Sequence, residues 1–335
     1  MKVDTKSNTY NYYPGCSMER NAAAYNISTL AVSNVLGIEL LEIDDWNCCG
    51  ATEYVSLNLL ASYALIARNL ALATKNNGNR HLIAPCSACY MNLRKCDAYM
   101  YESPQLAEKV NVALAAGGLS YEAGKMNIRH LLDVMVQDVG YEAIASQVTR
   151  PLTGLRIAPY YGCMIVRPQI EPNFDDPEYP TTLDVLMKTL GAEVVDYPMK
   201  AHCCGGHMTQ ISEASAYDMI RRLIKGAVEY HADLIVALCP MCQLNLDAYQ
   251  NAMNQYFKTN YRMPVLYFTQ AMGLAFGIDA SNLGIGAELV DARPALAKIG
   301  VEVAPSESGA TPRKPKRDDK TSLPMPKMPD REVTP

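Results

Sequence analysis

The tripeptide Cys-Cys-Gly occurs twice in this chain, at Cys48-Cys49-Gly50 and at Cys203-Cys204-Gly205. In each half of the sequence a single cysteine precedes the tripeptide and a Cys-x-x-Cys motif follows it. Ten of the eleven cysteines therefore form two sets of five in the same order. The sets are Cys16, Cys48, Cys49, Cys86 and Cys89, and Cys163, Cys203, Cys204, Cys239 and Cys242.

Residues beside the cysteines repeat as well. Tyr13-Pro14-Gly15-Cys16 corresponds to Tyr161-Gly162-Cys163, and Cys89-x-x-Asn92-Leu93 corresponds to Cys242-x-x-Asn245-Leu246. Repetition at so long a period indicates the duplication of a whole half rather than a short solenoid unit. We therefore expect two domains of the same fold, at residues 1–150 and 151–304.

The predicted elements follow the same order in both halves. A helical pattern that ends at a glycine precedes a strand pattern, and the cysteine pair comes next. A longer helical pattern and a short apolar run then lead to Cys-x-x-Cys. These segments are residues 22–36, 38–42, 54–75 and 82–84, and residues 181–190, 193–197, 212–230 and 234–237. The alternation predicts an α/β fold with a mainly parallel sheet in each half, and sites in such folds form at the carboxyl ends of strands.

Length and composition fit a globular protein of two domains. The chain has 335 residues, of which 49% are apolar and 19% are charged. Its beginning lacks the apolar core of a signal peptide, and no stretch is apolar for long enough to span a bilayer, so we expect a cytoplasmic protein. The net charge of -5 gives no sign of nucleic-acid binding. Residues 305–335 are rich in proline and charge, which predicts a disordered tail.

Eleven cysteines in a reducing compartment indicate metal binding or redox chemistry rather than disulfides. An ordinary four-iron cluster takes four thiolates, whereas each set offers five. Either one thiol stays free for catalysis, or all five bind an opened, non-cubane cluster. Structural zinc, which takes four thiolates, is the alternative, but it does not explain the fifth cysteine of each set. Cys96 has no counterpart in the repeat and is interpreted as a plain thiol.

Two histidines, His202 and His207, flank the second cysteine pair. They are candidate proton donors to a leaving thiolate. The alternative is that they hydrogen-bond cluster sulfur or the backbone, and we favour it because the first half has Asn47 and Glu53 in this region instead. The other three histidines, His81, His130 and His231, are expected to be structural.

The repeated cysteine pattern resembles the cysteine-rich CCG domain, and two intact copies look like the B subunit of heterodisulfide reductase. The resemblance implies that each set binds a non-cubane 4Fe-4S cluster through its five cysteines. It also implies that a disulfide is cleaved between the two clusters, each of which supplies one electron. Related subunits run thiol oxidation in the reverse direction or act on other substrates.

The electron donor must be another protein, because the chain has neither a ferredoxin-type cysteine run nor a G-x-G-x-x-G motif. The family resemblance implies a small ferredoxin-like iron-sulfur subunit that connects to a flavoprotein subunit. The substrate would be a small-molecule or protein-bound thiol or disulfide. Two rival functions stay open, namely an electron-transfer subunit that never contacts substrate and a zinc-stabilised docking subunit.

Overall fold

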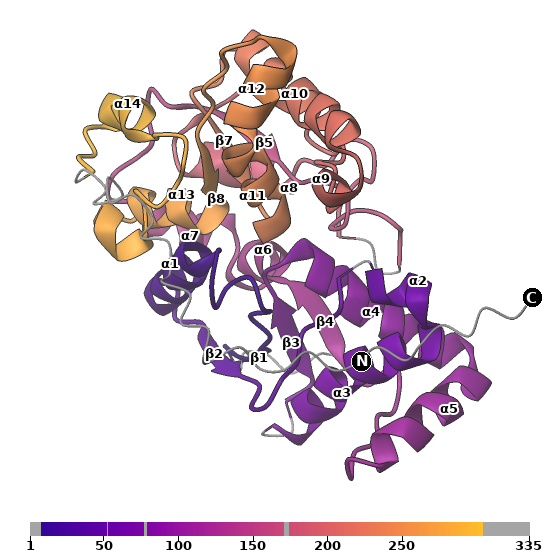
Figure 1. The fold of residues 1–335 in the computed structure, drawn as a ribbon. Helices are drawn as coiled ribbons and strands as arrows, with labels where there is room; N and C mark the ends of the chain where they lie inside the picture. The colour runs from indigo at the N-terminus through magenta and orange to yellow at the C-terminus, as the bar shows by residue number, and fades with distance from the viewer. Residues whose placement is uncertain (1–7, 52, 77–78, 171–173, 304–335) are drawn as a thin grey trace, which may run out of the picture. The chain divides into compact units, whose positions relative to one another are not determined.

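The computed structural model describes residues 8–51, 53–76, 79–170 and 174–303, and Figure 1 shows its fold. The predicted tail at residues 305–335 lies outside the described residues. Two four-stranded sheets are present in the described part of the chain, one in each half of the sequence. Every strand pair is parallel. The predicted α/β fold with two duplicated halves and parallel sheets is confirmed.

The first sheet has the strand order β2-β1-β3-β4. Its strands are β1 (Thr9–Tyr12), β2 (Glu39–Glu42), β3 (His81–Ala84) and β4 (Asn127–His130). The helices of this half are α1 (Ala23–Val35), α2 (Glu53–Leu57), α3 (Leu59–Lys75), α4 (Ser87–Glu102), α5 (Pro104–Ala115), α6 (Leu131–Val134), the π-helix η1 (Met135–Val139) and α7 (Tyr141–Ser146).

The second sheet repeats this order as β6-β5-β7-β8. Its strands are β5 (Arg156–Tyr160), β6 (Glu193–Val194), β7 (Leu234–Ala237) and β8 (Val265–Tyr267). The helices are α8 (Thr182–Thr189), α9 (Met208–Ile211), α10 (Glu213–Glu229), α11 (Pro240–Ala248), α12 (Gln250–Phe257), α13 (Phe268–Ala275), α14 (Arg293–Leu296) and the short 3-10 helices η2 (Ala280–Leu283) and η3 (Ala297–Ile299).

The strand order places a topological switch point in each sheet. The chain leaves β1 toward one edge to form β2 and then crosses to the other side of β1 to form β3. The second half does the same around β5. In open α/β sheets, the crevice beyond the carboxyl ends of strands at such a point is the usual binding site. Both halves therefore present a candidate site at the same edge.

Two predicted elements differ in detail from the structure. The helix expected at residues 54–75 is divided into α2 and α3 at Asn58, whose side chain caps α3 by accepting a hydrogen bond of 3.0 Å from the Ala61 N–H. The strand expected at residues 193–197 is only two residues long. The strand ends because the chain makes a tight turn at residues 195–197. The Tyr197 N–H closes this turn by donating to the Val195 carbonyl at 2.8 Å.

The two halves contact each other through helices far apart in the sequence. Helix α1 of the first half packs against α13 of the second. The hydroxyls of Ser28 and Thr269 lie 2.7 Å apart in this contact, and the rings of Tyr25 and Tyr267 stack nearby. All four side chains are buried. Where each half begins and ends remains a prediction, but the two halves share one continuous hydrophobic core.

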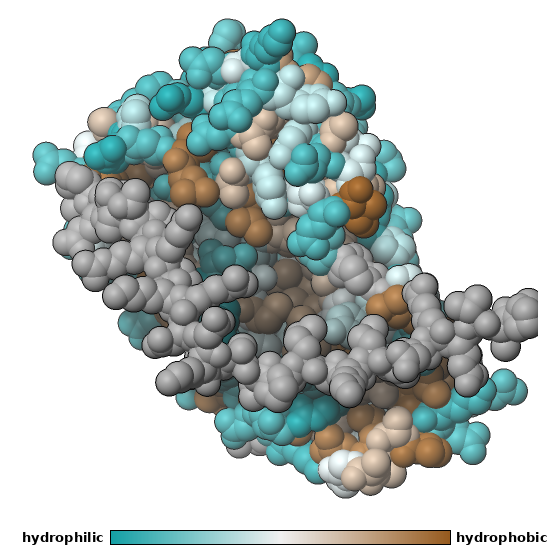
Figure 2. All heavy atoms as spheres, in the orientation of Figure 1, coloured by the Kyte–Doolittle hydropathy of each residue, from teal (hydrophilic) through white to brown (hydrophobic). Residues whose placement is uncertain are grey.

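The surface is largely hydrophilic on the face shown in Figure 2, with hydrophobic side chains gathered in a few places. The exposed apolar residues of the protein include Tyr54, Leu57 and Leu59, which lie where α2 meets α3. None of the helices that the structure describes is both long enough and apolar enough to cross a membrane.

Candidate metal centres at the carboxyl ends of the strands

The fold brings each set of five cysteines to one edge of its sheet. In the first half Cys16 follows β1, the adjacent pair follows β2, and Cys86 ends the loop after β3. Cys86 is the N-cap of α4, and Cys89 lies in the first turn of that helix. The second set has the same placement, with Cys239 as the N-cap of α11. Because parallel strands end at a common edge, residues distant in sequence meet there.

The sulfur atoms of the first set form a chain of close contacts. The Sγ atoms of Cys16 and Cys48 lie 3.4 Å apart, and those of Cys49 and Cys89 lie 3.4 Å apart. Hydrogen bonds between Cys48 and Cys49 and between Cys86 and Cys89 complete the chain. Cys16 and Cys48 are exposed, and the other three are buried. We call these five residues the first centre.

The second set, called here the second centre, repeats this chain. Cys163 bonds to Cys203, Cys203 to Cys204, Cys204 to Cys242, and Cys242 to Cys239. The second centre is less open than the first, because Cys163 and Cys203 are only partly exposed. The structure thus brings together all ten cysteines that the sequence singled out, in two equivalent groups.

The two centres meet where the halves adjoin. Cys86 and Cys239 are within hydrogen-bonding distance of each other. The Tyr25 hydroxyl reaches the carbonyls of the residues just before them, at 3.0 Å to Pro85 and 3.2 Å to Leu238. Ten sulfur atoms therefore form one continuous series across the boundary between the halves.

One thiol of each adjacent pair is held as a thiolate. Hydrogen bonds from the Cys16 and Cys49 thiols, with a smaller contribution from the Gly50 N–H, lower the pKa of Cys48 to about 2. The pKa of Cys203 is lowered to about 2 in the same way, chiefly by Cys163 and Cys204. Thiolate is the form of cysteine that binds metal, so these positions are suited to ligation.

A glycine before the first cysteine of each centre makes room for another cysteine of the same centre. Gly15 has a φ of +78° and Gly162 a φ of +70°, a left-handed backbone that disfavours side chains. A Cβ atom on Gly15 would lie 2.9 Å from the Cys89 Sγ, and one on Gly162 would lie 2.9 Å from the Cys242 Sγ. The repeated glycine therefore permits the close approach of backbone and sulfur.

Tyrosine hydroxyls fix the loop that carries the adjacent pair. The Tyr13 hydroxyl donates to the Asn47 carbonyl at 2.7 Å, and the Tyr160 hydroxyl donates to the His202 carbonyl at 2.7 Å. These carbonyls belong to the residues immediately before each pair. Burial raises the pKa of both phenols well above its usual value, so they stay protonated and keep donating.

Two asparagines occupy equivalent positions beside the second cysteine of each pair. The Asn92 amide nitrogen lies 3.7 Å from the Cys49 Sγ and also donates to the Ala51 carbonyl. The Asn245 amide nitrogen lies 3.6 Å from the Cys204 Sγ. The repeat in the sequence includes both asparagines, but no role was predicted for them. Their matching positions were the signal that could have identified them as donors to the centres.

The two histidines beside the second pair are placed differently from each other. His207 borders a cavity at the second centre, whereas His202 is exposed and does not line that cavity. Their role as proton donors remains a prediction. Cys96 lies apart from both centres, buried between helices with its thiol 3.6 Å from the Tyr63 carbonyl.

His130 was expected to be structural, and nothing in the sequence indicated its position near the junction of the two centres. It is fully buried at the end of β4, edge-on to the Tyr90 ring, and near enough to Cys239 to be influenced by its charge. Burial lowers its pKa to about 4, so the imidazole is neutral at pH 7. Its Nδ1 accepts from the Leu132 N–H at 3.1 Å, which places the proton on Nε2.

The cysteines are not arranged around the position of a single ion. Among the described residues there is no group of three or more His, Cys, Asp or Glu side chains placed to hold one metal ion. A cluster of several irons makes a different demand, because its thiolates bind separate irons at the edge of the cluster.

Two cavities open on the centres, and their linings differ. The cavity at the second centre has a volume of about 290 Å³ and is lined by all five of its cysteines and by apolar side chains. A cavity of about 610 Å³ borders Cys16 and Cys48 of the first centre. Its lining includes four carboxylates, those of Glu19, Glu42, Asp44 and Asp45.

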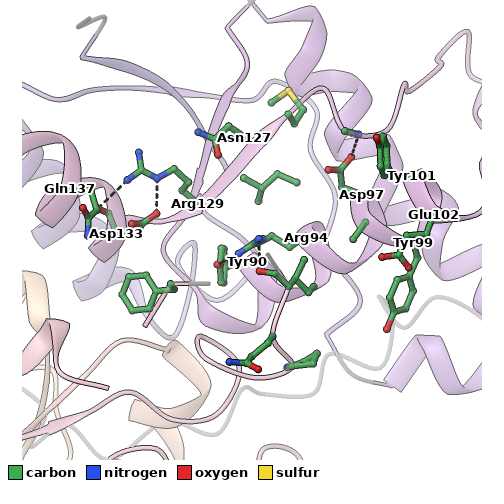
Figure 3. Close-up of a pocket in the computed structure, with 18 residues that line it drawn as sticks. Tyr90, Arg94, Asp97, Tyr99, Tyr101, Glu102, Asn127, Arg129, Asp133 and Gln137 are labelled. Carbon is green, nitrogen blue, oxygen red and sulfur yellow. Dashed lines mark hydrogen bonds and ion pairs between the residues drawn. The ribbon is translucent and has the colours of Figure 1, made fainter. Parts of the chain in front are cut away.

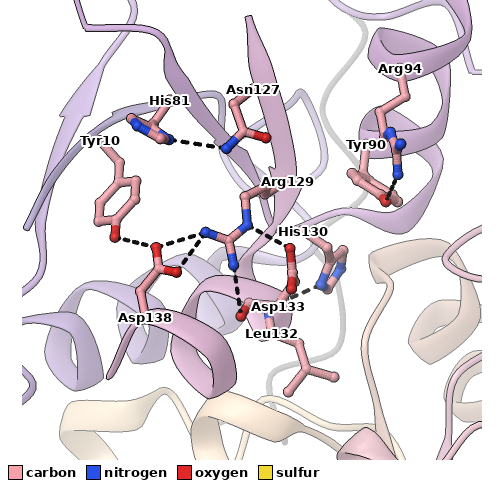
Figure 4. A network of polar contacts seen from close by, with 10 residues as sticks. All are labelled: Tyr10, His81, Tyr90, Arg94, Asn127, Arg129, His130, Leu132, Asp133 and Asp138. Atoms are coloured by element: carbon pink, nitrogen blue, oxygen red, sulfur yellow. Dashed lines mark hydrogen bonds and ion pairs between the residues drawn. The ribbon is translucent and has the colours of Figure 1, made fainter. Parts of the chain in front are cut away.

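A larger cavity, of about 1020 Å³, lies away from the cysteine sulfurs, between α4, β4 and the segment around Pro168 (Figure 3). Arg129 in its wall is already paired with carboxylates. Figure 4 shows that Arg129 bonds to both Asp133 and Asp138, at 2.6 and 2.7 Å, and that the Tyr10 hydroxyl also bonds to Asp138. This network ties η1 to the sheet, and we interpret it as a structural brace rather than a binding site.

Comparison with known proteins agrees with this duplicated geometry. The family model of the cysteine-rich domain CCG matches the chain twice, at residues 10–94 and 157–247. The chain belongs to the CCG cysteine-rich domain family. Each match contains all five cysteines of one centre, so the CCG repeat coincides with the structural repeat.

This CCG protein has relatives that align over most of its length. The 8-methylmenaquinol:fumarate reductase membrane anchor subunit of Wolinella succinogenes is 36% identical and aligns over 84% of this chain and 96% of its own. A protein of Archaeoglobus profundus that is named as like the B subunit of heterodisulfide reductase is 31% identical, over 82% of this chain and 92% of its own. The B subunit of a ferredoxin/F(420)H(2)-dependent CoB-CoM heterodisulfide reductase of Methanosarcina acetivorans is 29% identical, over 86% and 95%.

A solved structure shares the fold of this CCG protein. The crystal structure of a hypothetical protein from Helicobacter pylori superposes with a TM-score of 0.67 at 15% identity. The superposition covers 86% of this chain, which spans about half (53%) of the solved chain. At this identity the likeness shows a common fold alone.

Proposed function

We propose that this protein is the iron-sulfur subunit of a heterodisulfide reductase-like complex, and that it reduces a disulfide, or oxidises thiols in reverse, at its two cysteine centres. The observation that carries the proposal is the continuous series of ten sulfurs, in which Cys86 of one centre contacts Cys239 of the other. Relatives named as B subunits of heterodisulfide reductases support the same function.

The donor set of each centre fits an iron-sulfur cluster. Five thiols converge, at least one is held as a thiolate, and an asparagine amide lies near a sulfur. The ligands would be Cys16, Cys48, Cys49, Cys86 and Cys89 in one centre and Cys163, Cys203, Cys204, Cys239 and Cys242 in the other. Two 4Fe-4S clusters, of the non-cubane type if all five thiolates bind, would supply one electron each.

The chain's own residues would orient the substrate and manage protons around those clusters. Reducing a disulfide consumes two electrons and two protons and releases two thiols. His207 borders the cavity at the second centre, where it can pass a proton to a departing sulfur. The buried Tyr13 and Tyr160 hold the cysteine loops through carbonyl groups, which keeps the thiols in place during turnover.

The electrons would come from partner subunits. A small ferredoxin-like iron-sulfur subunit that receives electrons from a flavoprotein subunit is the arrangement we propose for the complex. The carboxylates near the first centre would attract a basic surface on such a partner.

A quinol-linked role is a second candidate function. The Wolinella succinogenes relative, whose name refers to 8-methylmenaquinol and to a membrane anchor, is 36% identical to this chain. That relationship in sequence is the observation that favours it. In that case the protein would exchange electrons with a quinol instead of a thiol.

Single-centre variants test the leading proposal. Cys86 and Cys239 are poor choices because they contact each other across the boundary, so we choose Cys48→Ala and Cys203→Ala, which lie within one centre each. The full chain should hold about eight iron and eight sulfide, and each variant about half as much. Each variant should lose disulfide reduction with a one-electron donor, because the remaining cluster passes one electron.

Cys96→Ala is the matched control, since it removes a buried thiol outside both centres. It should keep its full iron content and turnover. Near-normal turnover by either single-centre variant would contradict the two-centre mechanism and favour an electron-transfer subunit. A chain that holds zinc and no sulfide would instead favour the docking subunit.

A further inference from the structure

The last residue of the fourth strand has an equivalent position in the two sheets. In the first half the strand register pairs His130 with the residue two positions before Cys86. In the second half it pairs Tyr267 with the residue two positions before Cys239. Both side chains are buried, and each residue is the N-cap of the helix that follows its strand. His130 and Tyr267 are therefore counterparts at the junction of the two centres.

The hydrogen bonding of His130 fixes the position of its proton. Its Nδ1 accepts from the Leu132 N–H at 3.1 Å (Figure 4), so this nitrogen carries no proton. The proton of the imidazole then lies on Nε2, which makes Nε2 a donor. The side chain is fully buried, and Nε2 has no hydrogen-bond partner among the described residues. A buried donor is costly to leave unpaired, so we expect a partner for it.

The groups around the imidazole belong to the junction of the two centres. Burial lowers the pKa of His130, whereas the charge of Cys239 and the carbonyls of Pro85 and Leu238 act in the opposite direction, so these groups lie close to the ring. Both carbonyls already accept a hydrogen bond from the Tyr25 hydroxyl, and neither forms one with Nε2. Among these groups, the sulfur at Cys239 is the remaining acceptor for the Nε2 proton.

The counterpart of His130 offers no such donor. The Tyr267 hydroxyl donates to the Gln243 side-chain oxygen at 3.2 Å, and its ring stacks on Tyr25. The asparagine amides beside sulfur are repeated in the two halves, but the unpaired N–H of His130 is not. Of the two counterparts, only His130 has a free donor at the junction.

We propose that His130 is a positioning residue of the second centre, and that its Nε2–H donates to the sulfur held at Cys239 once a cluster is bound. The inference rests on the proposed function, because it requires an iron-sulfur cluster at that centre. Reduction adds negative charge to a cluster, and a buried N–H donor stabilises that charge and raises the reduction potential. A residue of the first half would thus shift an electron shared by the two centres toward the second.

Two substitutions separate the donor at Nε2 from the acceptor at Nδ1. In His130→Asn the side-chain oxygen lies about where Nδ1 lies, so the bond from the Leu132 N–H can remain while the distal donor is lost. In His130→Gln the amide nitrogen reaches about as far as Nε2, so the donor remains and the cap is lost. A role in capping alone makes asparagine the milder change. The proposed role makes glutamine the milder change for the reduction potential.

The test is a redox titration of the iron-loaded full chain, followed by EPR. The signal of the second centre is the one that Cys203→Ala removes. In His130→Asn the equilibrium constant for one-electron reduction of the second centre should fall about tenfold, which is about 59 mV. In His130→Gln it should stay within about twofold of the wild type. The first centre should change by less than about twofold in both variants.

Tyr267→Phe is the matched control, since it changes the counterpart position and removes a hydroxyl that bonds to Gln243. It should leave both reduction potentials unchanged. A second measurement is pulsed EPR of wild-type protein whose histidines carry a heavy nitrogen isotope. We expect a nitrogen coupling on the signal of the second centre. The coupling should disappear in His130→Asn, which distinguishes His130 from His202 and His207.

The outcomes separate this inference from the proposed function. An unchanged potential of the second centre in His130→Asn, or an equal fall in His130→Asn and His130→Gln, overturns the inference. A wild type without the nitrogen coupling, a coupling that persists in His130→Asn, or a fall of the same size in Tyr267→Phe also overturns it. In these cases full iron content and disulfide turnover leave the proposed function standing. A chain without iron and sulfide overturns the proposed function instead.

Discussion

Tyr25 of the first half stacks face to face on Tyr267 of the second, with ring centroids 4.3 Å apart and ring planes within 4° of parallel. The Tyr25 hydroxyl also bonds to carbonyls next to Cys86 and Cys239. One side chain therefore holds both the contact between the halves and the loops at the junction of the two centres.

Tyr25→Phe should lower the free energy of unfolding by about 1 kcal/mol, because it removes the buried hydroxyl but keeps the stacked ring. Tyr25→Ala should lower it by about 3–5 kcal/mol, since it also removes the ring and leaves a cavity. Chemical denaturation measures both. The control is Tyr256→Phe at a position that is 57% exposed, where a change below about 0.5 kcal/mol is expected. A Tyr25→Ala protein as stable as the wild type would show that the stack is dispensable.

Gly15→Ala should abolish the first centre, because the added Cβ would meet the Cys89 Sγ at 2.9 Å on a left-handed backbone. We expect iron and sulfide to fall to about half, with the EPR signal of the second centre retained. Gly162→Ala should do the same to the second centre. Gly118→Ala is the control, since its φ is +66° and no heavy atom lies within 4 Å of the added Cβ. Full iron content in Gly15→Ala would show that the sulfur position tolerates the methyl group.

Asn92→Leu should lower the reduction potential of the first centre by roughly 20–60 mV, the equivalent of losing one hydrogen bond to sulfur. Reduction adds negative charge, and an amide donor stabilises that charge. Asn245→Leu should lower the potential of the second centre by a similar amount. A redox titration followed by EPR measures both potentials. Each variant is the control for the other. If either variant shifts the reduction potentials of both centres, the effect of the asparagine is not local.

His130 should make the protein less stable in acid. Its pKa in the folded protein is about 4, below the usual value of about 6.5, because burial disfavours the charged ring. The unfolded chain therefore binds more protons between these values, and stability present above pH 6.5 is lost as the pH falls toward 4. The loss from this residue is about 3 kcal/mol.

His130→Gln should remove that part of the pH dependence, because glutamine has no charge to gain. The comparison is the free energy of unfolding of wild type and variant at about pH 7 and about pH 4.5, both without bound metal. The other titrating groups, including the thiols, are common to both proteins and cancel in the difference. If the free energy of unfolding falls by the same amount in wild type and variant between these two pH values, His130 makes no contribution.

The repeated cysteine pattern was sufficient to predict the duplicated parallel α/β fold and the convergence of each set of five cysteines. Strands such as β3 and β7 could be recognised because apolar runs end just before a cysteine. The β1 strand was missed because it reads Thr-Tyr-Asn-Tyr, and Asn11 is buried by bonding to backbone carbonyls from distant segments. Tertiary contacts of that kind leave no local pattern in a sequence.

The junction between the centres could not be predicted from the sequence. The contact of Cys86 with Cys239 and the burial of His130 depend on how the two halves pack, as α1 does against α13. The contrast between the acidic and apolar surroundings depends on which loops fold over the cysteines. All of these features depend on packing between segments that are far apart in the chain. Such contacts produce no periodic pattern in the sequence.

The contact of Cys86 with Cys239 has a consequence for how the protein is assembled. Each set of five cysteines comes from one half of the chain, so each half can gather its own thiols as it folds. The contact between the sets joins segments far apart in sequence, and such long loops close late in folding. Because synthesis proceeds from the N-terminus, the first half can fold before the second is complete. We therefore expect the contact between Cys86 and Cys239 to form last in folding. Under the proposed function, this late contact is the one that brings the two redox centres together.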